Sequence, residues 1–275
     1  MRLLLVTDSH LAPGVPPCNA NWRAAKDFAR AAGADLTLHL GDITLDGTED
    51  PAQHAWALAA CADWPTALRF LPGNHDIGDN PPGPGMPAEQ PLRLDQLAAY
   101  RRDYGSDYWA IDAAPWRLIG LNVQLFASDT PAEAAQWDWL GACLAEARGR
   151  PIALLLHKPL YRDDPGDGTA HIRYVPLAQR RQLLALLAGS DLRLVLSGHA
   201  HQYLDRVLAG VRHVWLPSTA FIIPDAMQER IGEKRTGLGV LDLSADGFRF
   251  ALVSPAGMAQ HALSDPAFDA VRKRR

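Results

Sequence analysis

Five short apolar runs constrain the fold of this chain more than any other feature of its sequence. They consist mainly of aliphatic side chains and occupy residues 3–7, 36–40, 68–71, 152–156 and 192–196. Runs of this length are typical of strands buried on both faces of a sheet. Helical patterns at residues 21–32 and 51–60 separate the first three runs. This alternation of strands and helices predicts a parallel sheet, and so an α/β fold.

Polar side chains follow directly where each apolar run ends. They are carboxylates, an amide and imidazoles: Asp8, His10, Asp42, Asn74, His75, Asp76, His157, His199 and His201. A single such group could be an ordinary turn, because Asn, Asp and Gly favour turns. Ligands of open α/β sheets bind at the carboxyl ends of the strands. We therefore expect the five runs to lie side by side in one sheet and to bring these side chains together.

The remaining patterns predict further helices at residues 92–102, 131–148 and 176–187. Alternating segments around tight turns predict hairpins at residues 108–122, 203–216 and 239–253. We expect the first half of the chain to build a parallel sheet and the second half to add another sheet packed against it. No repeat or linker composition divides the chain. A single domain over residues 1–275 is expected, with roughly the last 20 residues as an extension.

Two long loops follow the candidate site residues. Residues 77–91 contain five prolines and three glycines, so neither a helix nor a paired strand is expected there. The segment could be a plain connector, but its position directly after the candidate site makes it a candidate pocket wall. Residues 158–175 form a polar loop of a length that is usually functional or disordered. Arg162 and Arg173 could contact a phosphate or a base, but solvated positions are expected for both. Substrate contact stays open for His171. Substrate choice is expected to depend on these two loops and on residues 123–130.

The other histidines are expected to have structural roles. His39 lies inside an apolar run, so a hydrogen-bonded core position or a supporting role beside the site is expected. His54 and His261 are expected at the surface or partly packed. His213 falls inside a predicted hairpin strand.

Composition limits the partners and the compartment. A net charge of −4 does not favour a polyanion-binding surface, so nucleic acid is not an expected partner. Cys18, Cys61 and Cys143 form no Cys-x-x-Cys pair, which favours buried free thiols in a reducing compartment. No run is long enough for a membrane span, and the apolar start is too short for a signal peptide. We expect a cytoplasmic protein with a frayed basic tip at residues 272–275. A homo-oligomer is compatible with the sequence.

The polar residues at the strand ends include seven donors suited to metal ions. They are Asp8, His10, Asp42, Asn74, His157, His199 and His201. One ion takes roughly four to six ligands, so seven donors suit two ions that share one carboxylate. Mixed imidazole and carboxylate donors favour Mn, Fe or Zn over Ca. Two neighbouring ions form a clamp for in-line displacement at phosphorus.

The ordered set of motifs resembles the calcineurin-like metallophosphoesterase family. The set is Asp8-x-His10, Gly41-Asp42, Gly73-Asn74-His75-Asp76, His157 and Gly198-His199-Ala200-His201. The resemblance implies two mixed β-sheets packed as a sandwich and flanked by helices, in an α/β/β/α arrangement. It implies one metal on Asp8, His10, Asp42 and His201, and a second on Asp42, Asn74, His157 and His199. Asp42 would bridge them, and His75 would face the scissile group without binding metal.

Within that family the chain most resembles the bacterial cyclic-nucleotide phosphodiesterases. Asp8-Ser9-His10, Gly41-Asp42-Ile43-Thr44 and the two later motifs carry this likeness. It implies hydrolysis of a small phosphodiester, such as a 3′,5′-cyclic nucleotide, by metal-bound hydroxide, with Asp42 and His75 catalytic. The alternatives are a phosphomonoesterase or a pyrophosphatase of nucleotide conjugates or lipids. A non-enzymatic scaffold would be expected to lack some ligands or His75.

Overall fold

The five apolar runs all form strands, but the strands belong to two sheets. The computed structural model describes residues 1–83 and 85–269, so the predicted basic tip at 272–275 lies outside the described residues. The first three strands are adjacent and parallel in one sheet: β1 (Arg2–Val6), β2 (Leu36–His39) and β3 (Leu68–Phe70). β6 (Pro151–Leu156) and β7 (Asp191–Ser197) pair in the other sheet. The prediction of one shared sheet was wrong, because an apolar run specifies burial and not a pairing partner.

The first sheet has the strand order β11-β10-β1-β2-β3. Two of its strands, β10 (Leu238–Ser244) and β11 (Gly247–Val253), form a hairpin that is far from the others in the sequence. β10 runs antiparallel to β1, with Leu4 opposite Val240. The prediction that the second half builds its own sheet was therefore also wrong for this hairpin, which completes the free edge of β1.

The second sheet has the order β4-β5-β6-β7-β9-β8. Hairpins lie at both of its edges, as predicted: β4 (Trp109–Ala113) with β5 (Trp116–Gly120), and β8 (Leu204–Leu208) with β9 (Val211–Trp215). The four interior strands are parallel to one another. Both sheets are thus mixed, which confirms the predicted class.

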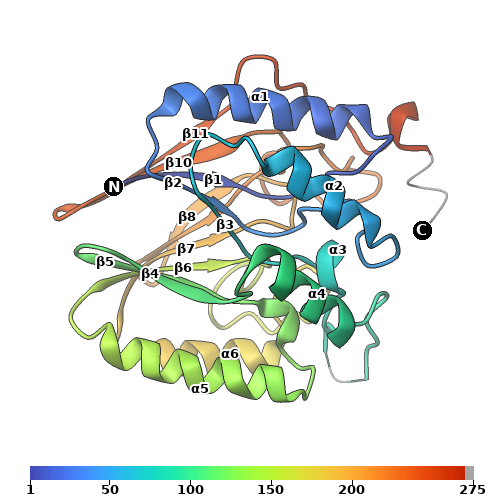
Figure 1. Cartoon of the computed structure of the whole chain (residues 1–275). Helices are drawn as coiled ribbons and strands as arrows, with labels where there is room; N and C mark the ends of the chain where they lie inside the picture. Colours follow the sequence, from blue (N-terminus) through green and yellow to red (C-terminus); the bar gives the residue numbers. More distant parts are fainter. Residues whose placement is uncertain (84, 270–275) are drawn as a thin grey trace.

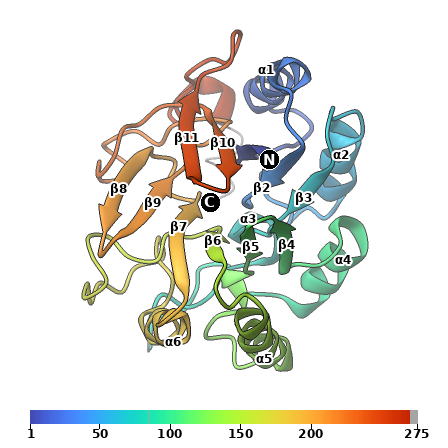
Figure 2. The same ribbon diagram turned by 90° about the vertical axis from the view of Figure 1, so that its left-hand side faces the viewer.

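Helices cover the outer face of each sheet. The first sheet carries α1 (Pro16–Ala32), α2 (Ala52–Cys61) and α4 (Leu94–Tyr104), and the second carries α5 (Pro131–Glu146) and α6 (Leu177–Leu187). The two sets of helices enclose the sheets in Figures 1 and 2. α1 begins at Pro16 rather than at the predicted Asn21. Proline is tolerated in the first helical turn because the backbone N–H groups of that turn make no hydrogen bond within the helix. Short elements are α3 (Asn74–Ile77) and the 3₁₀ turns Val123–Leu125 and Pro266–Phe268.

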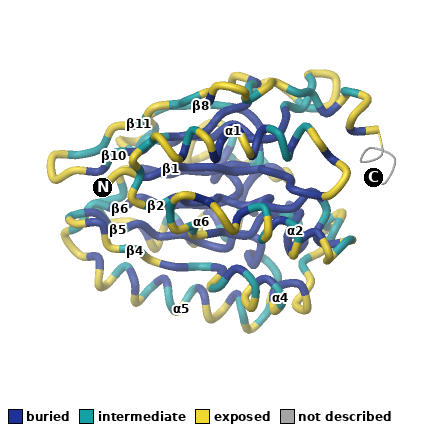
Figure 3. The backbone as a smooth tube through the Cα atoms, turned by 45° about the horizontal axis from the view of Figure 1, so that its top comes forward, coloured by how far each residue is buried: buried dark blue, intermediate teal, exposed yellow. Residues whose placement is uncertain are grey.

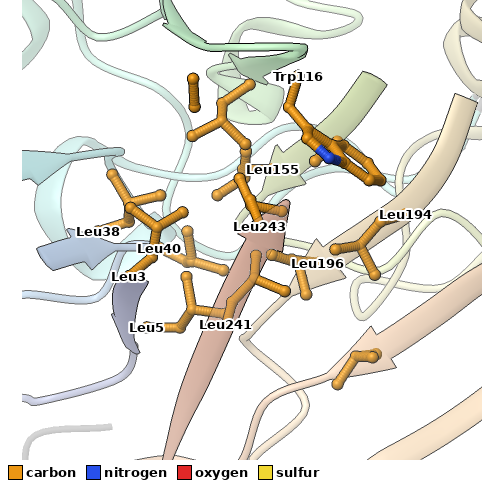
Figure 4. Close-up of a cluster of buried hydrophobic side chains, with 14 of the residues drawn as sticks. Leu3, Leu5, Leu38, Leu40, Trp116, Leu155, Leu194, Leu196, Leu241 and Leu243 are labelled. Carbon is orange, nitrogen blue, oxygen red and sulfur yellow. The ribbon is translucent and has the colours of Figure 1, made fainter. Parts of the chain in front are cut away.

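A leucine-rich layer fills the space between the two sheets (Figure 4). Its contributors from the first sheet and its strand ends are Leu3, Leu5, Leu38, Leu40, Leu241 and Leu243. The second sheet adds Trp116, Leu155, Leu194 and Leu196. Each fully buried side chain contributes about 1.5–3 kcal/mol. Figure 3 shows the central strands buried, the edge strands β8 and β11 partly exposed, and the helices alternating between buried and exposed turns. This packing holds the strand ends of the two sheets in fixed relative positions.

The burial of the cysteine and histidine side chains tests the remaining predictions about them. All three cysteines are buried and free, as predicted. His39 is buried with Nε2 at 2.8 Å from Ser9 Oγ, which confirms its expected core position. His54 is buried and its ring lies 3.2 Å from the Tyr104 hydroxyl, so its predicted surface position was wrong. Among the described residues, no helix is both long enough and apolar enough to cross a bilayer.

Candidate metal centre

The carboxyl ends of β1, β2, β3, β6 and β7 meet at one edge of the sandwich. Within each sheet, backbone hydrogen bonds join neighbouring ends: Asp8 N donates to Gly41 O at 2.9 Å, and Gly198 N donates to His157 O at 2.8 Å. Across the two sheets, His199 N donates to the Asp8 carboxylate at 3.0 Å. The predicted convergence therefore occurs, although it takes place between two sheets rather than along one.

The backbone turns sharply at five of the donors. Asp8, His10, Asp42, His199 and His201 all have a positive φ, between 45° and 62°. This left-handed conformation costs roughly 1–2 kcal/mol for a residue with a side chain. Such strain persists where the surrounding structure imposes it, most often at functional sites. The conformation directs these side chains inward as the chain leaves each strand.

Three glycines precede donors because no side chain fits at their positions. A Cβ on Gly73 would lie 2.1 Å from Asp42 Oδ1, and one on Gly198 would lie 2.0 Å from Thr7 Oγ1. A Cβ on Gly41 would lie 2.6 Å from His157 Nδ1. The Gly-Asp, Gly-Asn and Gly-His pairs of the sequence thus have a steric origin, since each donor packs against the neighbouring strand end.

One group of donors consists of Asp8, His10 and His201, whose ligand atoms lie within 4.8 Å of one another. His10 Nε2 is 3.1 Å from His201 Nε2, which is 3.4 Å from Asp8 Oδ1. Asp8 Oδ1 is buried and accepts no hydrogen bond from the residues that the structure describes. A buried carboxylate oxygen of this kind requires a cation or a donor, so the group fits a metal ion.

A second group lies on the other side of Asp42. Its members Asp42, His157 and His199 also place their ligand atoms within 4.8 Å of one another. His157 Nε2 lies 3.4 Å from Asp42 Oδ1, 3.2 Å from His199 Nδ1 and 3.3 Å from Asn74 Oδ1. Asp42 Oδ2 faces the first group instead, at 3.9 Å from His10 Nε2. Asp42 therefore stands between the two groups, with one oxygen toward each.

Backbone carbonyls orient three of the imidazoles. Nδ1 of His157 donates to Leu40 O at 2.8 Å, and Nδ1 of His201 donates to Phe221 O at 2.9 Å. In His199 the other ring nitrogen, Nε2, donates to Ile172 O at 3.3 Å. In each ring the remaining nitrogen points to the donor group, where it can bind a metal once it carries no proton. This arrangement is usual for histidines that bind metal.

The charges within the site favour the metal-binding forms of Asp42 and His199 but the protonated form of His157. Burial raises the pKa of Asp42, but His157, His75 and His10 together hold it well below its usual value, so Asp42 is a carboxylate. Burial, reinforced by His157, lowers the pKa of His199 well below 6.5 and keeps it neutral. Burial lowers the pKa of His157 too, yet Asp42 and Asp8 outweigh it and raise that pKa to about 9. A metal ion at His157 competes with this proton.

Comparison with known proteins identifies the family. Residues 1–203 match the family model described as calcineurin-like phosphoesterase. The chain belongs to this family. It is therefore an enzyme of the phosphoester hydrolase class, and the resemblance noted in the sequence is confirmed.

Relatives at low identity span nearly the whole phosphoesterase chain. A probable cyclic nucleotide phosphodiesterase from Synechococcus is 28% identical over 259 residues, covering 90% of this chain and 89% of the relative. The 3′,5′-cyclic adenosine monophosphate phosphodiesterase CpdA of Escherichia coli is 25% identical over 260 residues, with coverage of 90% and 86%. A crystal structure of a dimetal phosphatase from Danio rerio superposes with a TM-score of 0.63 at 14% identity, covering 92% of this chain and 95% of that one. The structural likeness supports the fold.

Asp76 holds the loops of this phosphoesterase site together. Its buried carboxylate accepts hydrogen bonds from the backbone N–H groups of Ile43 at 3.1 Å, Thr44 at 2.9 Å and Gly73 at 2.9 Å. These bonds join the residues after Asp42 to the start of α3. No role was predicted for Asp76 from the sequence, although Asp76 follows Gly73 at the spacing of a helix-capping acid.

A fully buried lysine, which was not predicted from the sequence, also stabilises the loops of the site. Lys158 pairs with Asp79 and donates to Asn80 Oδ1 at 2.8 Å. The amide of Gln124, with its oxygen toward Asn74 N at 2.9 Å and its nitrogen toward Asp79 Oδ1 at 3.0 Å, extends this network to the candidate ligand Asn74. The chain after His157 is thus tied to the chain around Asn74.

Five of the seven donors line a cavity of about 770 Å³: His10, Asp42, Asn74, His199 and His201. Glu89 and Gln90 line it from the 77–91 loop, which confirms the predicted pocket wall. His171, Ile172 and Arg173 line it from the 158–175 loop, which was expected to contribute. Arg173 is buried, so its predicted solvation was wrong.

Two other candidates for substrate selection lie outside this metal-centre cavity. Arg162 instead pairs with Glu229 at 2.8 Å. Residues 123–130 contribute Ala127 and Asp129 to a separate cavity of about 500 Å³, beside the start of α6. Of the three loops expected to select substrate, two therefore line the cavity that holds the donors.

Proposed function

We propose that this enzyme hydrolyses small phosphodiesters, such as 3′,5′-cyclic nucleotides, with two bound metal ions. The observation that carries the proposal is the position of Asp42, whose two oxygens face separate donor groups. The names of the Synechococcus and Escherichia coli relatives favour cyclic nucleotides as the substrate class.

The proposed ligands follow the two donor groups. Asp8, His10, Asp42 and His201 would hold one ion, and Asp42, Asn74, His157 and His199 the other. Neutral imidazoles with carboxylate and amide oxygens suit Mn, Fe or Zn. When bound, such ions supply Lewis-acid polarisation of the phosphoryl group and a water molecule of lowered pKa. The carboxylate of Asp42 would fix the spacing of the pair.

His75 is the proposed general acid. It lines the cavity, its backbone N donates to Asp42 Oδ1 at 2.9 Å, and its Nε2 lies 3.9 Å from Asp42 Oδ2. An imidazole in this place can give a proton to the leaving oxygen, an effect worth roughly 10²–10⁴-fold in rate. The same distances would also allow His75 to bind metal, because His10, Asp42 and His75 form a third group of close ligand atoms.

Removal of the His75 ring separates these two roles. As a general acid, His75→Ala keeps its metal content and loses turnover, with a smaller loss for nitrophenyl esters, whose leaving group needs no proton. Metal content and kcat are measured on the same preparation. A variant that loses metal and is impaired equally on every substrate would show that His75 is a ligand.

The cavity size favours a substrate with an organic group of nucleotide size over a small phosphate ester. About 770 Å³ is in the range of pockets that enclose an organic molecule of nucleotide size. A phosphoryl group alone would fill little of it. The walls from the 77–91 and 158–175 loops leave space for an organic group on the phosphate beside the donors.

A substrate panel tests the proposal. Enzyme loaded with Mn is assayed with cyclic AMP, cyclic GMP, bis(p-nitrophenyl) phosphate, p-nitrophenyl phosphate and a nucleotide pyrophosphate. We expect the highest kcat/KM for a diester, by roughly 10-fold or more, from interactions that the cavity makes with the transition state of diester hydrolysis. A preference for monoesters or pyrophosphates would replace the proposal by one of those activities. Absence of turnover on every substrate in metal-loaded protein would favour a scaffold.

A further inference from the structure

One side of the donor cavity is apolar, and the proposed catalytic roles do not use it. We call Phe221, Ile223, Met227 and Leu263 the apolar wall. The first three belong to the connection between β9 and β10, and Leu263 belongs to the segment after β11. No motif marks any of these residues in the sequence.

The apolar wall is firmly built. Ile222 N donates to His261 O at 2.8 Å, and Leu263 N donates to Ile222 O at 2.9 Å, so the two segments run side by side. The buried side chain of Asn21 donates to Ala220 O at 2.9 Å and to Ala259 O at 2.8 Å. A surface fixed in this way loses little entropy when a ligand packs on it.

Phe221 joins the apolar wall to the first donor group. Its ring lies 4.9 Å from the His10 ring and 4.8 Å from the His201 ring, between centroids. Beyond Phe221 the wall extends to Met227, whose side chain is 52% exposed. A ligand at the donors can therefore reach the wall without leaving the cavity.

The other side of the cavity differs in chemistry. The second donor group meets the 158–175 loop through His199 and Ile172, and His171 and Arg173 line the cavity there. The apolar wall therefore adjoins the first donor group through Phe221, while His171 and Arg173 lie with the second. Gln228 and Glu229, which follow Met227, add polar groups to the cavity lining.

We infer that the apolar wall binds the heteroaromatic base of a nucleotide substrate. The inference rests on the proposed function, because it places the phosphate of that substrate at the donors. A planar base buries its faces well against aromatic and aliphatic side chains. The phosphate and sugar, which carry the charge and hydroxyl groups, then lie among the donors and the polar residues of the 158–175 loop.

Two truncations test the inference without touching the donors. Ile223→Ala and Met227→Ala each remove part of the apolar wall, and Phe221 is left intact because it contacts His10 and His201. The matched control is Val207→Ala on β8, which truncates an aliphatic side chain that is 65% exposed outside this cavity. Urea unfolding shows that each variant remains folded.

The first readout compares substrates with the same reacting bond. Each enzyme is assayed with 3′,5′-cyclic AMP and with the base-free methyl riboside 3′,5′-cyclic phosphate. We expect the wild type to prefer the nucleotide, and Ile223→Ala to lower kcat/KM for it roughly 10-fold while the base-free compound changes less than about twofold. Met227→Ala should act in the same direction, and Val207→Ala should change neither substrate.

The second readout does not depend on turnover. Calorimetry with the Mn-loaded protein gives Kd for AMP and for ribose 5-phosphate. The base should tighten binding in the wild type, and this gain should shrink in Ile223→Ala and Met227→Ala. If both ligands weaken equally, or if the base adds nothing, the inference is wrong. If the base binds as expected but no cyclic phosphate is hydrolysed, the diesterase proposal fails and the base site stands.

Discussion

Gly73→Ala places one methyl group beside the carboxylate of Asp42. The φ of Gly73 is −106°, which any residue can adopt, so backbone strain does not arise. Only the steric contact separates alanine from glycine here. The new Cβ would lie 2.1 Å from Asp42 Oδ1 and 2.3 Å from Asp42 N, far inside the shortest observed contacts of about 3.0 Å.

The size of the effect follows from the displacement. Either Asp42 or the chain at Gly73 must move by about 1 Å, and a misplacement of this size costs roughly 10²-fold in catalytic rate. Overpacking of a tight interior typically costs about 1–3 kcal/mol of stability. We therefore expect Gly73→Ala to fold, to lose at least 10²-fold in kcat on a diester, and to bind metal more weakly.

Gly141→Ala is the matched control for this prediction. Gly141 lies inside α5, and a Cβ there meets nothing within 4 Å. The same methyl group should stabilise the protein by about 0.8–1 kcal/mol, because alanine favours helix more than glycine does. Both variants are compared in urea unfolding, metal content and kcat/KM. Retention of full activity and metal by Gly73→Ala would refute the steric argument.

Two further predictions concern stability. Asp79→Asn removes the anionic partner of the fully buried Lys158, which should cost about 3–5 kcal/mol in urea unfolding. The double variant Asp79→Asn with Lys158→Met should recover much of the lost stability. A loss below about 1 kcal/mol in Asp79→Asn alone would contradict the prediction. Burial lowers the pKa of His213 to about 4, so the folded state binds this proton less readily than the unfolded state does. The contribution of His213 to the free energy of unfolding is therefore fully present above about pH 6.5 and falls by about 2 kcal/mol when the pH is lowered to 5. His213→Gln should lack this pH-dependent loss of stability. An equal loss in the variant would show that His213 is not its source.

Local features of the sequence were sufficient to find the donors. Each apolar run is a strand, and each donor stands within a few residues of its end, because the polypeptide must turn there and the glycines allow close approach. Whether these donors bind metal remains a proposal. Their convergence could be predicted because parallel strands present their carboxyl ends in the same direction.

Long-range pairing could not be predicted in the same way. The edge of β1 is completed by β10, and Met1 N donates to Leu243 O at 2.9 Å, across nearly the whole chain. An apolar run would bury equally well in either sheet, so its composition does not identify its neighbours. The apolar wall and the burial of Lys158 also depend on such distant contacts.

Metal stoichiometry tests the central proposal most directly. Protein stripped with a chelator and then titrated with Mn is assayed for bound metal per chain and for diester hydrolysis, alongside Asp42→Asn. We expect the stripped wild type to be inactive and to regain turnover as it binds two ions. Asp42→Asn removes charge from both donor groups, so it should fail to hold at least one ion and lose nearly all turnover. Full activity in stripped protein, or two ions and normal turnover in Asp42→Asn, would contradict the two-metal proposal.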